Sequence, residues 1–109
     1  MAQTETTEAY ADDTPLLELF GDTARTRIIS ALLGSDLDLN ASELALQAGI
    51  ARPTLYDHLE DLGNLGVLAV SRETAQGKRY QLAEGELGEQ LQRTEGVVLR
   101  NLLEVEDEL

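Results

Sequence analysis

The chain of 109 residues contains no cysteine, no tryptophan and a single histidine. Without cysteine it has no disulfide framework, no thiolate metal site and no thiol redox chemistry, and one histidine cannot build a cluster of metal ligands. No apolar run approaches the roughly 18 residues that a membrane span requires, and the acidic N-terminal stretch lacks the apolar segment of a secretory signal. These absences favour a cytoplasmic, single-domain protein that uses no cofactor and no metal.

Basic residues are also scarce, since 21 acidic residues stand against eight basic ones, and Lys78 is the one lysine. The imbalance lies in the flanks: residues 40–82 hold five acids and four bases, whereas 1–39 and 83–109 each hold eight acids and two bases. Adaptation to molar salt explains this composition, because the Debye length is then about 3 Å and hydrated carboxylates maintain solubility. The alternative is an acidic protein of an ordinary cell that binds basic partners or mimics DNA.

Residues 40–65, NASELALQAGIARPTLYDHLEDLGNL, form the centre of the chain and predict two helices separated by a tight turn. Asn40 and Glu43 have the spacing of a capping box, in which each side chain binds the other residue's backbone N–H. Gly49 stands where a helix commonly ends in a left-handed residue. Pro53 fits the first turn of the second helix, where its missing N–H has no partner to lose. This pattern is typical of a helix-turn-helix, although any three-helix domain can join two helices in this way.

The second helix has one apolar face and one polar face. Leucines spaced four and three residues apart form a stripe that we expect to be buried, namely Leu55, Leu59 and Leu62. The opposite side carries Pro53, Thr54, Tyr56, Asp57, Glu60 and Asp61. In a helix-turn-helix this polar side is the one offered to the major groove of DNA.

The residues before the motif predict an acidic tail and two short helices. Residues 1–13 are polar and lack apolar periodicity, so we expect them to be disordered unless a partner orders them. A first helix is predicted from Leu16 to Phe20 and a second from Thr23 to Leu33, with Asp22 as the capping residue of the second. Alternation in residues 37–39 allows one short strand there.

The residues after the motif predict a β-hairpin. Two β-rich runs, 67–72 and 78–82, are joined by a turn segment that ends in Gly77. A hairpin directly after a helix-turn-helix is a wing. Three basic side chains gather near its tip and favour contact with DNA phosphate, although exposed tips also simply tolerate charge: Arg72, Lys78 and Arg79.

Residues 84–109 predict a long helix with an apolar stripe. Its positions are Leu87, Leu91, Val98, Leu102 and Val105, continued by Leu109. A helix of roughly 22 residues is longer than a core of this size can cover, so we expect the stripe to form a homodimer interface. The alternative is that the helix folds back over the first helix of its own chain.

The segments GDTARTRIISALL and NASELALQAGIARPTLYDHLEDLGNLGVL, followed by the hairpin, resemble the winged helix-turn-helix regulators of the ArsR type over about residues 15–82. The lead-in PLLELFGDTAR is similar to haloarchaeal members. The pair His58-Leu59 fits the family's recognition helix, which usually carries small polar residues before it, whereas Ala51, Pro53 and Tyr56 depart from that pattern. The resemblance implies a dimeric transcription regulator. Metal sensing, which in this family uses cysteine or histidine clusters, does not carry over.

We therefore expect a mainly α fold with a small β-hairpin, divided into a tail (1–13), a winged helix-turn-helix (14–83) and a dimerisation helix (84–109). The expected partners are double-stranded DNA, a second copy of the chain and monovalent cations at the DNA interface. No membrane partner and no enzymatic activity are expected, because no nucleophile–base pair or phosphate-binding loop is present. The alternative function is a winged-helix module that binds a protein and not DNA. The residues expected to contact DNA are Arg52, Pro53, Thr54, Tyr56, Asp57, Arg72, Lys78 and Arg79.

Overall fold

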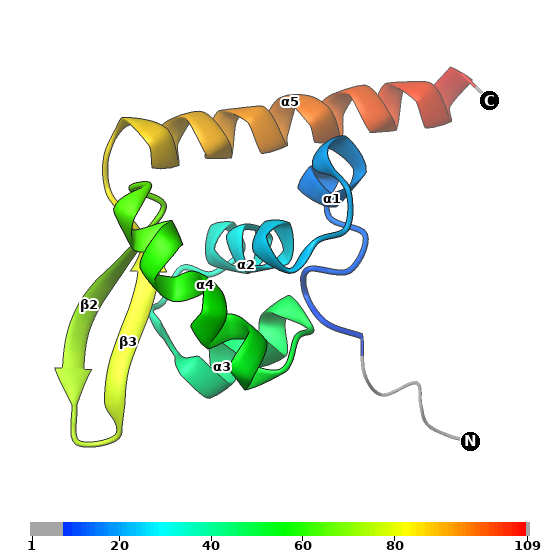
Figure 1. The fold of residues 1–109 in the computed structure, drawn as a ribbon. Coiled ribbons are helices and arrows are strands. Elements are labelled where there is room, and N and C mark those ends of the chain that lie inside the picture. The colour runs from blue at the N-terminus through cyan, green and yellow to red at the C-terminus, as the bar shows by residue number, and fades with distance from the viewer. Residues whose placement is uncertain (1–7, 109) are drawn as a thin grey trace, which may run out of the picture.

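The computed structural model describes residues 8–108 and combines a helical body, a small sheet and one long terminal helix (Figure 1). The elements in chain order are α1 (Pro15–Phe20), α2 (Ala24–Leu33), β1 (Leu39–Asn40), α3 (Ala41–Ala48), α4 (Arg52–Asn64), β2 (Leu68–Thr74), β3 (Gly77–Leu82) and α5 (Glu86–Glu108). The predicted fold class, a winged helix-turn-helix with a long C-terminal helix, is confirmed. Among the described residues, no helix combines the length and the hydropathy that crossing a membrane would need.

The turn between α3 and α4 has the local structure that the sequence predicted. The Asn40 side chain accepts a hydrogen bond from the Glu43 N–H at 2.8 Å, and the Glu43 carboxylate accepts one from the Asn40 N–H at 2.9 Å. Gly49 ends α3 with a φ of 76°, a left-handed conformation that glycine adopts without strain. These two devices stop and restart the helix within a few residues, which fixes the direction in which α4 leaves.

The core is formed where α2, α3, α4 and the sheet meet. Leu55 and Leu62 of α4 are fully buried there, and Leu59 is partly buried against the same cluster. Tyr80 of β3 also lies in the core, so the hairpin is packed onto the body at its base. The remaining buried members are Ile28, Ala31, Leu32, Leu44, Ala45, Ala48, Val67 and Leu68. The leucine stripe of α4 therefore faces inward, as the spacing predicted.

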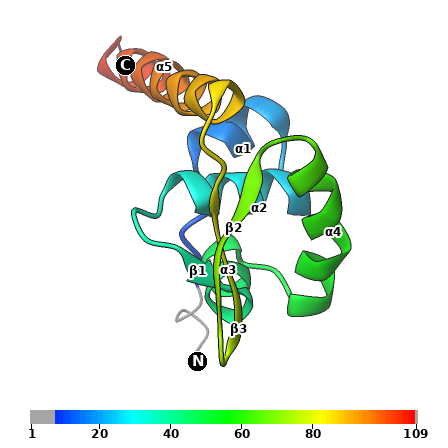
Figure 2. The ribbon, with the colours of Figure 1, turned by 90° about the vertical axis from the view of Figure 1, so that its left-hand side faces the viewer.

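The sheet has the strand order β1-β3-β2, with both pairings antiparallel. The β2–β3 hairpin turns through Ala75 and Gln76, and Gly77 follows with a φ of 115°. The register shifts between Val70 and Arg72, which leaves one extra residue in β2. Figure 2 shows α4 standing to one side of this hairpin, so the hairpin and α4 lie opposite each other on one face of the molecule.

The start of α2 differs from the prediction. Its capping residue is Thr23, whose hydroxyl accepts a hydrogen bond from the Thr26 N–H at 3.1 Å, and the helix begins at Ala24. Asp22 does not cap the helix. Its carboxylate instead pairs with Arg27 at 2.7 Å, and this ion pair decides between two neighbouring residues that are both good capping types.

The predicted disordered tail is only partly within the described residues, because residues 1–7 lie outside them. Residues 8–13 are packed against the body, contrary to that expectation. Ala11 is fully buried and its N–H donates to the Gln47 carbonyl at 2.9 Å, while Asp12 pairs with Arg27 at 2.7 Å. Composition alone missed this, because the segment is fixed by one small buried side chain and one ion pair.

Helix α5 lies across α1 and projects beyond it (Figures 1 and 2). The predicted apolar stripe is divided between two environments. Leu91 packs against the core and Val98 is partly buried, as the fold-back alternative described. Leu87, Leu102 and Val105 stay largely exposed. The stripe is therefore covered at its centre by the body and uncovered toward its ends.

A candidate nucleic-acid interface

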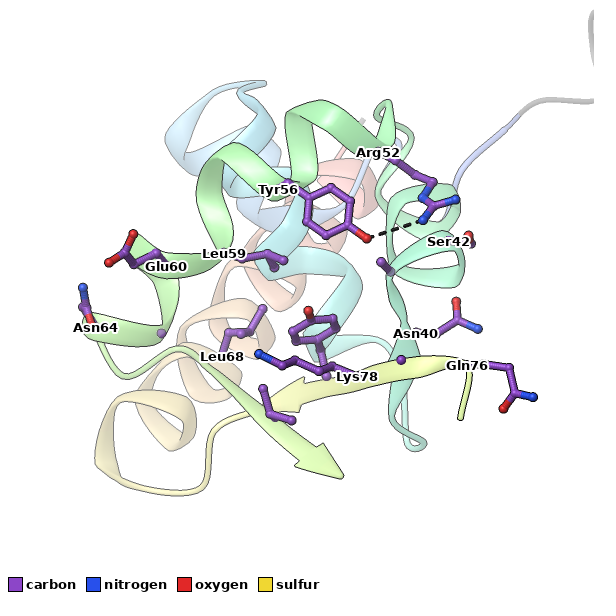
Figure 3. Close-up of a pocket in the computed structure, with 15 residues that line it drawn as sticks. Asn40, Ser42, Arg52, Tyr56, Leu59, Glu60, Asn64, Leu68, Gln76 and Lys78 are labelled. Carbon is purple, nitrogen blue, oxygen red and sulfur yellow. Dashed lines mark hydrogen bonds between the residues drawn. The ribbon is translucent and has the colours of Figure 1, made fainter. Parts of the chain in front are cut away.

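A cleft of about 990 Å³ separates α4 from the hairpin (Figure 3). One wall is α4, the other is formed by β2 and β3, and the start of α3 closes one end. Its lining residues come from four stretches of chain, 40–42, 52–64, 68–70 and 76–80. The lining side chains belong to Asn40, Ala41, Ser42, Arg52, Tyr56, Leu59, Glu60, Asn64, Leu68, Val70, Gln76, Lys78 and Tyr80, with Gly63 and Gly77 contributing backbone.

The cleft has an apolar middle and polar ends. Leu59, Leu68 and Val70 line the middle, together with the ring of Tyr80. Figure 3 shows Arg52 at one end of α4 and Glu60 and Asn64 at the other end, which places opposite charges at opposite ends of the cleft.

Two cationic side chains of the cleft, Arg52 and Lys78, have no carboxylate within ion-pair distance among the described residues. The Arg52 guanidinium makes one long contact, 3.4 Å to the Tyr56 hydroxyl. Lys78 lines the cleft from β3, and its side chain extends toward Leu68 (Figure 3). Both positive charges are therefore available to an anion that enters the cleft.

The other two predicted wing contacts, Arg72 and Arg79, are engaged on the opposite side of the hairpin. Both bind the Asp38 carboxylate, at 3.0 Å from Arg72 and 2.9 Å from Arg79. Arg79 also donates to the Asp38 carbonyl at 2.9 Å and to the Glu43 carboxylate at 3.2 Å. The predicted cluster of three basic residues is thus divided, because neighbouring residues of β3 point to opposite faces.

Asp38 is the acceptor at the centre of this second group. Hydrogen bonds from Ser71, Arg79 and Arg72 hold the pKa of its carboxyl well below the usual range. The side chain of Arg79 is 22% exposed and that of Arg72 is 62% exposed. Arg79 is therefore a structural link between the hairpin and the start of α3, while Arg72 keeps part of its guanidinium in solvent.

The predicted contact residues of α4 lie on its exposed side, with one exception. Arg52, Pro53, Tyr56 and Asp57 are exposed, whereas Thr54 is partly buried. Only Arg52 and Tyr56 of this group also line the cleft. The exposed surface of α4 therefore has two parts. Arg52 and Tyr56 face the wing, and Pro53 and Asp57 face outward.

One ion pair with α2, the packing of the α4 leucines and a hydrogen bond at the end of α3 hold α4 in this orientation. Arg25 of α2 binds Asp61 at 3.1 Å, and Arg27 donates to the Ala48 carbonyl at the end of α3 at 3.0 Å. His58 is partly buried, and its Nδ1 has no hydrogen-bond partner among the described residues. Because Asp61 pairs with Arg25, Asp57 and Glu60 are the acidic side chains of α4 without an ion pair in the described chain.

Several functional positions were missed from sequence. Asp38 and Ser71, which fix the hairpin, and Gln76, which lines the mouth of the cleft, carried no motif. The one available signal was the alternation of residues 37–39, which placed Asp38 on the opposite face from its two leucine neighbours. Its partners lie 34 and 41 residues away, so no local pattern specifies them.

One comparison with known proteins, the scan against family models, found a similarity. The family model described as "Bacterial regulatory protein, arsR family" matches residues 22–70, which span α2 to the start of β2. The search of curated proteins and the search of solved structures each returned no significant match. The matched segment contains the whole helix-turn-helix, and it supports an ArsR-type helix-turn-helix regulator, a class that binds DNA and is typically not enzymatic.

Proposed function

We propose that the protein is a sequence-specific, DNA-binding transcription regulator that acts as a homodimer, with α4 in the major groove and the β2–β3 wing beside the phosphate backbone. The observation that carries the proposal is the pairing state of the basic side chains. Of the six basic residues before α5, four are held in ion pairs within the described residues, and the two without such a pair, Arg52 and Lys78, both line the cleft between α4 and the wing. Such a placement suits an interface for an anionic polymer.

The contacts that we assign follow from this geometry. Arg52 is the candidate for a bidentate contact to guanine, because its guanidinium is exposed at the start of α4. Pro53, Thr54 and Tyr56 would lie along the groove, and Asp57 would either accept from a cytosine amino group or repel phosphate at wrong sites. Lys78 would hold the backbone, with Arg72 contributing only if it leaves Asp38.

The direct test is a footprint of the purified protein on the DNA upstream of its own coding region, in high KCl. The proposal expects a protected site that an unrelated fragment of the same length does not show. If the protein instead acts as a protein-interaction module, no specific footprint will appear at any salt concentration.

The salt dependence of binding is a second expectation. Each phosphate contact contributes a slope of about −0.9 in log K against log salt, and so few free cations provide little counterion release. We propose that affinity is flat or rises with KCl, because cations enter between DNA phosphates and Asp57 or Glu60. Asp61, on the same polar side of α4, already pairs with Arg25. A titration between roughly 0.5 and 3 M KCl that falls steeply would contradict this mechanism.

The homodimer is proposed from the apolar surface that the body leaves uncovered. On α5 this surface includes Leu102 and Leu103, and on α1 it includes Phe20, which is 59% exposed. Exposed apolar groups in one contiguous area mark interaction sites. Leu103→Glu should convert dimer to monomer in light scattering, whereas Gln92→Glu, an exposed change on the same helix, should not. A monomeric wild-type protein would remove this part of the proposal.

A further inference from the structure

The cleft between α4 and the wing contains more apolar surface than a phosphate contact would use. Val70 and Tyr56 are 47% and 50% exposed in its walls, and Leu59 and Leu68 line the space between them. Val70 and Tyr56 are accessible to solvent, whereas Leu68 is only 7% exposed, and covering the exposed groups would be favourable for an apolar ligand. A phosphodiester has no apolar surface of this kind to offer.

The size of the cleft also suits a small molecule. Its volume of about 990 Å³ lies at the upper end of the range that small-molecule sites usually show, which is about 300–1,000 Å³. Such sites combine an apolar lining with a few placed polar groups. Here those groups are the Arg52 guanidinium, the Lys78 ammonium and the hydroxyls of Tyr56 and Tyr80.

The charges specify which kind of molecule would fit. Arg52 and Lys78 have no carboxylate partner in the described chain, so each can bind a negative group. Glu60 at the opposite end of α4 disfavours a second one (Figure 3). In a chain with a formal net charge of −13, two cations without an ion pair among the described residues favour an anionic ligand in this cleft, and Glu60 limits it to one anionic end.

We infer that this cleft binds a small organic acid, a single carboxylate on an apolar body, and that its occupation excludes DNA. The carboxylate binds the Lys78 ammonium, which extends toward Leu68 (Figure 3), and the apolar body lies against Leu59 and Val70. The inference rests on the proposed function, because it makes the ligand an effector that takes a cation needed for DNA. Ligand and DNA would then compete for one site, without any conformational relay.

Binding can be measured by NMR on the full chain with 2-naphthoate as the probe and 2-naphthamide as its uncharged counterpart. The inference expects naphthoate to shift the amide signals of Tyr56, Gly63, Val70 and Lys78 and to leave those of α5 unchanged. It also expects naphthamide to bind more weakly. Equal binding of the two probes, or shifts confined to the apolar face of α5, would overturn it.

Two variants distinguish binding at the cationic end of the cleft from nonspecific binding of an anion to the protein. Lys78→Met should weaken naphthoate binding by about tenfold, since a hydrogen bond to a charged group is lost, and should leave naphthamide binding unchanged. The matched control is Arg100→Met, which removes an exposed α5 cation that also has no ion pair in the described chain. An equal loss in both variants would show that only net charge matters, and the site would be rejected.

Competition with DNA completes the test. Naphthoate should release a fluorescent upstream fragment from the wild-type protein, whereas naphthamide at the same concentration should not. If the fragment binds and naphthoate never displaces it, the inference fails while the proposed function stands. If the fragment never binds while naphthoate still shifts the cleft signals, the proposed function fails and the binding site alone survives.

Discussion

Two pairs of basic side chains flank the β2–β3 hairpin, and they are used in opposite ways. Arg72 and Arg79 share the Asp38 carboxylate and tie the hairpin to the chain before α3. Arg52 and Lys78 face the α4 cleft and have no ion pair among the described residues. The comparison teaches that the number of bases in a segment does not measure the charge that it offers to DNA, because internal acids neutralise some of them first.

The acidic composition explains why the difference between paired and unpaired basic side chains is informative. With 21 acids for eight bases, most basic side chains will find an internal carboxylate unless the fold keeps acids away. The middle of the cleft is lined by Leu59, Leu68 and Val70, and its one acid, Glu60, is at the end of α4 away from Arg52. A basic group left unpaired under these conditions carries more information about function than a basic group in an ordinary protein.

The largest expected effect comes from removing a core side chain that fixes α4 against the body of the protein. Leu55→Ala deletes a fully buried side chain of α4, and it should lower the free energy of unfolding by about 2–5 kcal/mol through lost burial and a cavity. Chemical denaturation measures this directly. The control is Leu46→Ala on α3, where the side chain is 74% exposed and the expected change is within about 0.5 kcal/mol. Equal effects of the two changes would mean that the core does not fix α4.

The next effect bears on DNA and compares the two pairs directly. Arg52→Ala should weaken binding to the footprinted site by about 1–3 kcal/mol and relax the preference at one base pair, because a bidentate base contact is lost. Arg72→Ala should cost less, since that guanidinium is already bound to Asp38. Fluorescence anisotropy at fixed KCl measures both. A larger loss for Arg72→Ala would reverse the assignment of the two sides.

These expectations depend on features that the sequence revealed to different degrees. The helix-turn-helix could be predicted because its signals are local: the capping box at Asn40, the left-handed Gly49 and the leucine spacing of α4. The hairpin could be predicted for the same reason. Each of these is set by residues within a turn or two of one another, where propensity and periodicity apply.

The division of the basic cluster could not be predicted, because it depends on contacts between distant residues. Asp38 meets Arg79 only after β1 pairs with β3, and the extra residue in β2 helps to decide which side chains face it. The covering of Leu91 by the body has the same origin, since it depends on how α5 crosses α1. Sequence periodicity identifies an apolar face but does not say which partner covers it.

The smallest expected effect is on thermal stability, and its pH dependence tests the ion pairs that Asp38 forms with Arg72 and Arg79. Asp38→Asn should lower the thermal midpoint at neutral pH, by less than Leu55→Ala does, because Arg72 and Arg79 lose their ionic acceptor. The pKa of Asp38 is depressed in the folded protein, so the unfolded chain takes up the proton first, near its ordinary pKa of about 3.9. The stability that the carboxylate contributes is therefore complete above that pH and is lost as pH falls toward the folded pKa.

The difference between wild type and Asp38→Asn should accordingly be constant from pH 5 to 8 and shrink below about pH 4. Asp36→Asn, an exposed aspartate two residues earlier, serves as the control for a general change in net charge. If both variants show the same pH dependence, Asp38 is not a special acceptor, and Arg72 and Arg79 would be as free for DNA as Arg52 and Lys78. The distinction between the two sides of the hairpin would then rest on the cleft alone.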